Sequence, residues 1–177
     1  MRNLLILVLL FSFQSGRCQN RFKAGVELDA LPYITGGYFA AGWAGAGHAR
    51  VRALYAKVHM PAFVVPNGFT NNTINSFALL GDYFLKKNFK GPWMSAGIVM
   101  WQGDIQTDKR IETATYNIFL LNGSLGFVHY FNRWLYISPW AGMSIRGGGD
   151  SNIPIDGENF NPPVFNPELS VKVGIRF

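Results

Sequence analysis

The feature that most restricts the fold is a strict two-residue alternation at the end of the sequence. One set of side chains over residues 168–177 is apolar, namely Leu169, Val171, Val173, Ile175 and Phe177. The intervening set is polar or very small, namely Glu168, Ser170, Lys172, Gly174 and Arg176. Because successive side chains of a β-strand point to opposite faces of the sheet, this pattern predicts a strand with one wholly apolar face.

The same alternation recurs along the chain and predicts eight strands. Their expected ranges are 22–31, 36–45, 48–58, 75–86, 92–103, 114–128, 134–145 and 167–177. A tilted strand crosses a bilayer with roughly 9–11 residues, which most of these ranges provide. An even number lets the first and last strands pair, so that no sheet edge is left in lipid. The predicted fold class is therefore all-β: a closed, antiparallel, up-and-down, eight-stranded transmembrane β-barrel.

The composition agrees with a sheet that meets lipid. Charged residues and aromatic residues each make up 15% of the chain, whereas an average soluble domain is about 25% charged. Too few charges are present to coat the surface of a soluble domain. After residue 20 the sequence contains no apolar run of the roughly 18 residues that a transmembrane helix needs. The net charge of +6 comes from scattered residues, which argues against a nucleic-acid-binding surface.

The connections between the expected strands alternate in length. Residues 45–47, 87–91 and 130–133 are short, whereas 59–74, 104–113 and 146–166 are long. The segment 32–35 is the exception, because it is short where a long loop is expected. Outer-membrane barrels have short periplasmic turns and longer external loops. The pattern therefore places both ends of the barrel sequence on the periplasmic side.

The N-terminal segment has the features of a secretory signal peptide. A basic start at residues 1–3 precedes the apolar run 4–13, and the small residues Gly16 and Cys18 suit cleavage after Cys18. We expect a signal peptide at 1–18 and a barrel domain at 19–177, which would contain no cysteine and no disulfide. In the alternative, Cys18 is the lipidated first residue of a lipoprotein, although Arg17 departs from the usual lipoprotein pattern.

With these features, the chain resembles the small eight-stranded outer-membrane barrels of the OmpA/OmpX/OmpW type. Its overall sequence character is similar to that of such proteins from Bacteroidetes. The resemblance covers residues 21–177 and includes the terminal run Val173-Gly174-Ile175-Arg176-Phe177. It implies export to the outer membrane of a Gram-negative bacterium and contact with outer-membrane lipid and lipopolysaccharide. It also implies that Phe177 belongs to the signal read by the barrel-assembly machinery during insertion. An architectural resemblance of this kind does not identify an activity.

A secreted lipocalin-like ligand carrier is an alternative fold of similar size and strand number. It would reverse the two faces of the sheet, with apolar side chains inside and polar ones outside. The polar set here carries too few charges to make a barrel exterior soluble. The membrane barrel is therefore the favoured reading.

Nine charged residues are expected to point into the lumen: Lys23, Glu27, Asp29, Arg50, Arg52, Asp82, Glu168, Lys172 and Arg176. An eight-stranded barrel is just wide enough for side chains to fill it, and charges removed from water need partners. We expect a polar network in which Glu27 and Asp29 meet Arg50 and Arg52 across the lumen. A narrow channel or small-solute conduit is the alternative.

We expect no enzyme activity, cofactor or metal. A lipid A-modifying barrel enzyme is the alternative, because His59 and Ser76 fall near the external ends of neighbouring strands, where a base could reach a nucleophile. The acidic external loops lack the spacing of a calcium-binding loop. The apolar segment 60–66 is expected to cap the barrel mouth, touch lipid or contact a surface partner.

Overall fold

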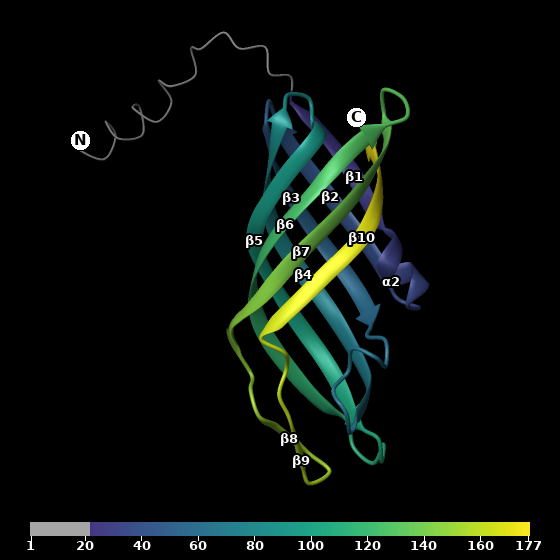
Figure 1. Ribbon diagram of the computed structural model, residues 1–177, viewed down its shortest axis with the longest axis vertical. Coiled ribbons are helices and arrows are strands. Elements are labelled where there is room, and N and C mark those ends of the chain that lie inside the picture. Colours follow the sequence, from purple (N-terminus) through teal and green to yellow (C-terminus); the bar gives the residue numbers. More distant parts are fainter. Residues whose placement is uncertain (1–21) are drawn as a thin grey trace, which may run out of the picture.

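The eight expected strands form a closed antiparallel barrel, which confirms the predicted fold class. The structure is a computed structural model that describes residues 22–177; the predicted signal peptide, with Cys18, lies outside the described residues. The strands are β1 (Lys23–Asp29), β2 (Tyr38–Ala46), β3 (Ala49–His59), β4 (Phe69–Lys86), β5 (Lys90–Thr107), β6 (Ala114–Tyr130), β7 (Leu135–Gly149) and β10 (Phe165–Arg176). They neighbour one another in the order β1-β10-β7-β6-β5-β4-β3-β2 (Figure 1).

The barrel closes where β1 pairs with β10. Their register runs from Gly25 opposite Arg176 to Asp29 opposite Lys172. On the other side, β1 pairs with β2, so each of the eight strands has a neighbour on both sides. The polar backbone groups of such a sheet are satisfied within it, as an apolar solvent requires.

The two faces of the sheet are as the alternation predicted. On β1, the outward Val26 and Leu28 are 48% and 52% exposed, whereas the inward Glu27 and Asp29 are 1% and 2% exposed. The outer face is apolar around the barrel and the inner face carries the charges. This is the reverse of a lipocalin-like interior.

The two ends of the barrel differ in the length of their connections. Figure 1 shows the C-terminus beside the short turns, and the small hairpin of β8 (Ile153–Ile155) and β9 (Glu158–Phe160) at the opposite end. We call these the turn end and the loop end. Within residues 22–177, no helix is both long and apolar enough to cross a membrane.

Strands β4 and β5 extend further toward the loop end than the sequence predicted. β4 begins at Phe69 instead of residue 75, and β5 continues to Thr107 instead of ending at 103. Phe69 pairs with Thr107, beyond an irregularity between Thr70 and Thr73. The segment Thr70–Thr73 is polar on both faces, so it lacked the alternation by which strands are recognised.

The short connection expected between the first two strands contains a five-residue helix, α2 (Ala30–Ile34). The Asp29 side chain caps it by accepting a hydrogen bond from the backbone amide of Leu31. Because of this helix, β1 ends at Asp29 and β2 begins at Tyr38, so both are shorter than predicted. Figure 1 shows α2 on the flank of the barrel, away from both ends.

Candidate functional site

The most distinctive site is a group of four buried charged residues in the lumen. Glu27 comes from β1, Arg50 and Arg52 from β3, and Asp82 from β4. None is more than 3% exposed. We call these four residues the charge cluster.

Each arginine of the charge cluster contacts both carboxylates. Arg50 Nη2 lies 2.9 Å from Glu27 Oε1, and Arg50 Nε lies 2.5 Å from Asp82 Oδ2. Arg52 Nη1 lies 3.1 Å from Glu27 Oε2, and Arg52 Nη2 lies 3.0 Å from Asp82 Oδ1. The cluster is thus a closed ring of alternating charge with a formal sum of zero. Such reciprocal pairing is what makes buried charges tolerable in a low-dielectric interior.

Strand register explains how the ring assembles. Arg50 lies directly opposite Asp82 in the β3–β4 pair. Glu27 is two strands away from the arginines and lies opposite Ala41 of the intervening β2. Ala41 is inward-facing and buried, and its small side chain leaves room for the arginines to reach Glu27. The alternation fixed the direction of these side chains, but not which of them would meet.

Aromatic side chains surround the charge cluster. Tyr136 donates a hydrogen bond of 2.8 Å to Glu27 Oε1 and accepts one of 2.7 Å from Trp43 Nε1. The Arg50 guanidinium lies 4.9 Å from the centre of the Trp43 ring, and that of Arg52 lies 5.2 Å from the Trp93 ring. Cation–π contacts of this kind stabilise desolvated arginines. Tyr136, Trp43 and Trp93 were not predicted for this site; the signal that could have identified them is a large aromatic side chain at an inward-facing position.

Asp29 was expected to meet an arginine, and this expectation is wrong. It pairs with Lys172 of the adjacent strand β10, at 3.6 Å. Trp140 Nε1 donates a 2.7 Å hydrogen bond to Asp29, and Ser170 also donates to it. Lys172 Nζ lies 3.5 Å from the centre of the Trp140 ring. This second buried pair lies beside the charge cluster, on neighbouring strands.

The other three predicted lumen residues lie apart from the charge cluster. Glu168 accepts a 2.6 Å hydrogen bond from Ser144. Lys23 and Arg176 lie at the turn end, where both bind Asn88: Lys23 Nζ donates to its side chain at 2.7 Å, and Arg176 donates to its backbone carbonyl at 3.1 Å.

A second, apolar layer fills the lumen at the loop end. It contains the buried residues Val65, Leu80, Val99, Ile105, Tyr116, Ile118, Leu120, Ile153 and Phe160. Val65 comes from the loop after β3, whereas Ile153 and Phe160 come from the β8–β9 hairpin. The apolar loop 60–66 therefore caps the barrel mouth through Val65, while Phe63 of the same loop is 89% exposed. We call this layer the apolar plug.

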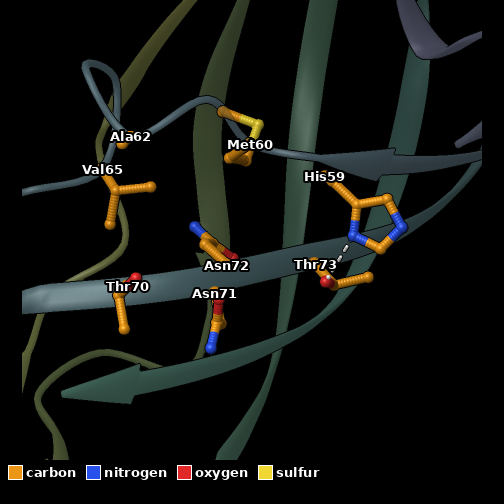
Figure 2. A pocket seen from close by; sticks show the side chains of 8 residues that line it. All are labelled: His59, Met60, Ala62, Val65, Thr70, Asn71, Asn72 and Thr73. Carbon is orange, nitrogen blue, oxygen red and sulfur yellow. Dashed lines mark hydrogen bonds between the residues drawn. The ribbon is translucent and has the colours of Figure 1, made fainter. Parts of the chain in front are cut away.

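The residues considered for catalysis do not assemble. His59 lies opposite Thr73 and its Nδ1 is 2.9 Å from Thr73 Oγ1, whereas Ser76 lies opposite Ala56. Figure 2 shows His59 and Thr73 at the edge of a cavity of about 370 Å³. No carboxylate lines this cavity, so an acid to orient the histidine is missing there.

His48 and His129 lie near the turn end, and the His48 ring contacts the carbonyl of Phe84. Within residues 22–177, no group of three or more His, Cys, Asp or Glu side chains is arranged to hold a metal ion.

A closed eight-stranded antiparallel barrel with an apolar exterior is the fold of small outer-membrane barrels. Two solved structures are similar to this chain in fold. The N-terminal β-barrel domain of Pseudomonas aeruginosa OprF is 15% identical, with 90% of this chain and 100% of that chain covered and a TM-score of 0.58. Neisserial surface protein A (NspA) is 12% identical, with 88% and 94% covered and a TM-score of 0.51.

At these identities the likeness concerns the fold alone. No protein-family model matches the sequence, and no curated protein does. The Bacteroidetes-like character and the OmpA, OmpX or OmpW subtype stay predictions.

Proposed function

We propose that this protein is a non-enzymatic barrel of the Gram-negative outer membrane, with an envelope-structural or surface-interaction role. The apolar outer face and the difference between turn end and loop end support this location, because both are usual in outer-membrane barrels. The proposal includes export by the predicted signal peptide, lipid and lipopolysaccharide around the barrel, and insertion by the assembly machinery. The side chain of Phe177 is 77% exposed beside the turn end, where such machinery could reach it.

The single observation that most supports the proposal is that side chains fill the lumen in two layers along the barrel axis. The charge cluster and its aromatic neighbours occupy the half toward the turn end, and the apolar plug occupies the half toward the loop end. A passing ion would have to displace paired, desolvated charges and then pass the apolar plug. Both steps oppose conduction, so the geometry favours a structural or surface role over a channel.

Planar-bilayer recording tests this reading against the channel. We expect the folded protein to insert without discrete conductance steps, because both layers block the lumen. Reproducible ohmic steps from the unaltered protein would contradict the proposal and favour the narrow channel.

Mass spectrometry of lipid A tests the reading against the enzyme. We expect the same acyl pattern in cells that produce the unaltered protein, in cells that produce His59→Ala and in cells without the protein. An acyl change that needs the unaltered protein and disappears with His59→Ala would make it a lipid A-modifying enzyme.

A further inference from the structure

The acidic residues of this barrel are unevenly distributed along its axis. All ten acidic residues belong to the described part of the chain, and none lies at the turn end. Four are in the lumen: Glu27, Asp29, Asp82 and Glu168. The other six lie at the loop end: Asp104, Asp108, Glu112, Asp150, Asp156 and Glu158.

The turn end is basic. It carries six lysines and arginines, which we call the basic rim: Lys23, Lys86, Lys87, Lys90, Arg133 and Arg176. Three of them lie in or beside the β4–β5 turn, one lies in the β6–β7 turn, and two lie near the ends of β1 and β10. The rim therefore follows the end of the barrel at which the C-terminus lies in Figure 1.

Most of the basic rim is open to the surroundings. Lys86, Lys87, Lys90 and Arg133 are exposed. The salt bridges found within residues 22–177 join lumen residues, and these four take part in none of them. None of these four side chains thus forms an ion pair with an acidic side chain of residues 22–177.

Some rim residues are held in place by local contacts. Arg176 donates hydrogen bonds to the carbonyls of Asn88 and Arg133, and its guanidinium lies 4.4 Å from the centre of the Tyr130 ring. Lys90 Nζ lies 5.6 Å from the same ring. These contacts tie the β4–β5 turn, the β6–β7 turn and the end of β10 to one another, so the rim is a defined surface.

The rim also lies at the level of exposed aromatic side chains. Tyr83, Phe131 and Trp134 are 51%, 63% and 47% exposed, and Trp134 directly follows the rim residue Arg133. Exposed tyrosines and tryptophans of membrane proteins gather at the level of the lipid headgroups. Cations at this level meet headgroup phosphates, whereas cations further out would meet water.

We propose that the basic rim binds the phosphate groups of anionic phospholipids in the leaflet that surrounds the turn end. The inference rests on the proposed function, under which this is the periplasmic leaflet. Lysine and arginine side chains donate charge-assisted hydrogen bonds to phosphate oxygens, and basic residues near an anionic lipid surface add to its attraction. The site thus favours phosphatidylglycerol over a zwitterionic phospholipid.

Quenching of tryptophan fluorescence measures this preference at the rim itself. The unaltered full barrel is placed in vesicles of phosphatidylglycerol and phosphatidylcholine, with bromine on the acyl chains of one lipid or the other. Trp134 reports the lipid beside the rim, and Trp134→Phe supplies the signal of the other tryptophans. We expect a preference of about fivefold or more for phosphatidylglycerol, since roughly 1 kcal/mol per basic residue corresponds to about fivefold, and a smaller preference at high salt.

Two triple variants, each of which removes three positive charges, test whether the lipid preference depends on the basic rim. K86Q/K87Q/K90Q removes half of the basic rim, and K57Q/K109Q/R110Q removes three cations that lie away from the turn end. We expect the first to lower the preference severalfold, because three of the six rim cations are removed, and the second to leave it unchanged. A preference that is as large in the rim variant as in the unaltered protein, or that both variants lower equally, would overturn the inference.

Two further readouts separate the ways in which the inference can fail. Each protein is checked for folding by its faster gel migration before boiling. If the unaltered protein does not fold into vesicles, the proposed function fails; if it folds and shows no lipid preference, only this inference fails. If free inorganic phosphate abolishes the preference at constant ionic strength, the rim is a site for soluble anions and the lipid assignment is wrong.

Discussion

At the scale of single residues, the charge cluster has little tolerance for the loss of one partner. Arg52 contacts both Glu27 and Asp82, and its side chain is 1% exposed. Replacing it with leucine would leave two buried carboxylates to share Arg50 alone. Breaking a buried pair in this way usually costs about 3–5 kcal/mol, because a charge remains without compensation.

We therefore expect Arg52→Leu to lower the free energy of unfolding by several kcal/mol. Urea titration in vesicles, followed by the loss of the fast-migrating folded band, measures this quantity. The exposed Lys109 is the matched control, and Lys109→Leu should change the value by less than about 0.5 kcal/mol. Equal stability of Arg52→Leu and the unaltered protein would show that the cluster is not desolvated as described.

Two glycines of β6 provide a second test of how tightly the lumen is packed. A Cβ atom on the inward Gly126 would lie 2.4 Å from the Trp93 ring, whereas one on the outward Gly123 would meet nothing within 4 Å. Trp93 also donates a hydrogen bond to Ser138, which restricts how far its ring can move.

We expect Gly126→Ala to destabilise the barrel by about 1–3 kcal/mol, as overpacking does. Gly123→Ala should be neutral or slightly stabilising, because alanine in a strand avoids the entropic cost of glycine. The same urea titration compares the two variants. Equal effects at both positions would contradict a filled lumen at the level of Trp93.

At the scale of elements, strands were predictable from the sequence where apolar and polar residues alternate. Elements without this alternation were missed. All eight strands were predictable, since one face of each needed apolar side chains. The polar segment 70–73 was missed because both of its faces are polar. The helix α2 was missed because its five residues are too few for a helical period.

The candidate site was predictable only in part, for a related reason. The alternation identified Glu27, Arg50, Arg52 and Asp82 as inward-facing, but their contacts depend on register and on barrel closure. The pairing of Asp29 with Lys172 follows from the contact between β1 and β10, which lie at opposite ends of the barrel sequence. Periodicity within one strand carries no information about that register.

The β8–β9 hairpin should be dispensable for barrel closure. Its strands pair only with each other, and β7 pairs with β10 without them. We expect replacement of residues 151–163 by a short Gly/Ser linker to leave the folded gel band in place. It should also leave bilayer conductance absent, because the charge cluster still fills the other half of the lumen. Conductance steps in this variant alone would show that the apolar plug is the only seal.

At the scale of the whole molecule, the barrel has an apolar exterior, a filled lumen and two ends that differ from each other. The exterior requires an apolar solvent, since strongly exposed side chains such as Leu125 and Leu169 cannot form a solvated surface over a whole barrel. The filled lumen leaves the surface and its loops as the parts available to partners. The unlike ends give the barrel a defined direction across a membrane.

The most direct test of this account is gel migration of the protein from the outer-membrane fraction, compared before and after boiling, with circular dichroism in detergent. We predict faster migration of the unboiled sample and a β-rich spectrum, because a closed barrel resists unfolding by the gel detergent until it is heated. A protein found soluble in the periplasm, with migration unaffected by boiling, would contradict the membrane barrel.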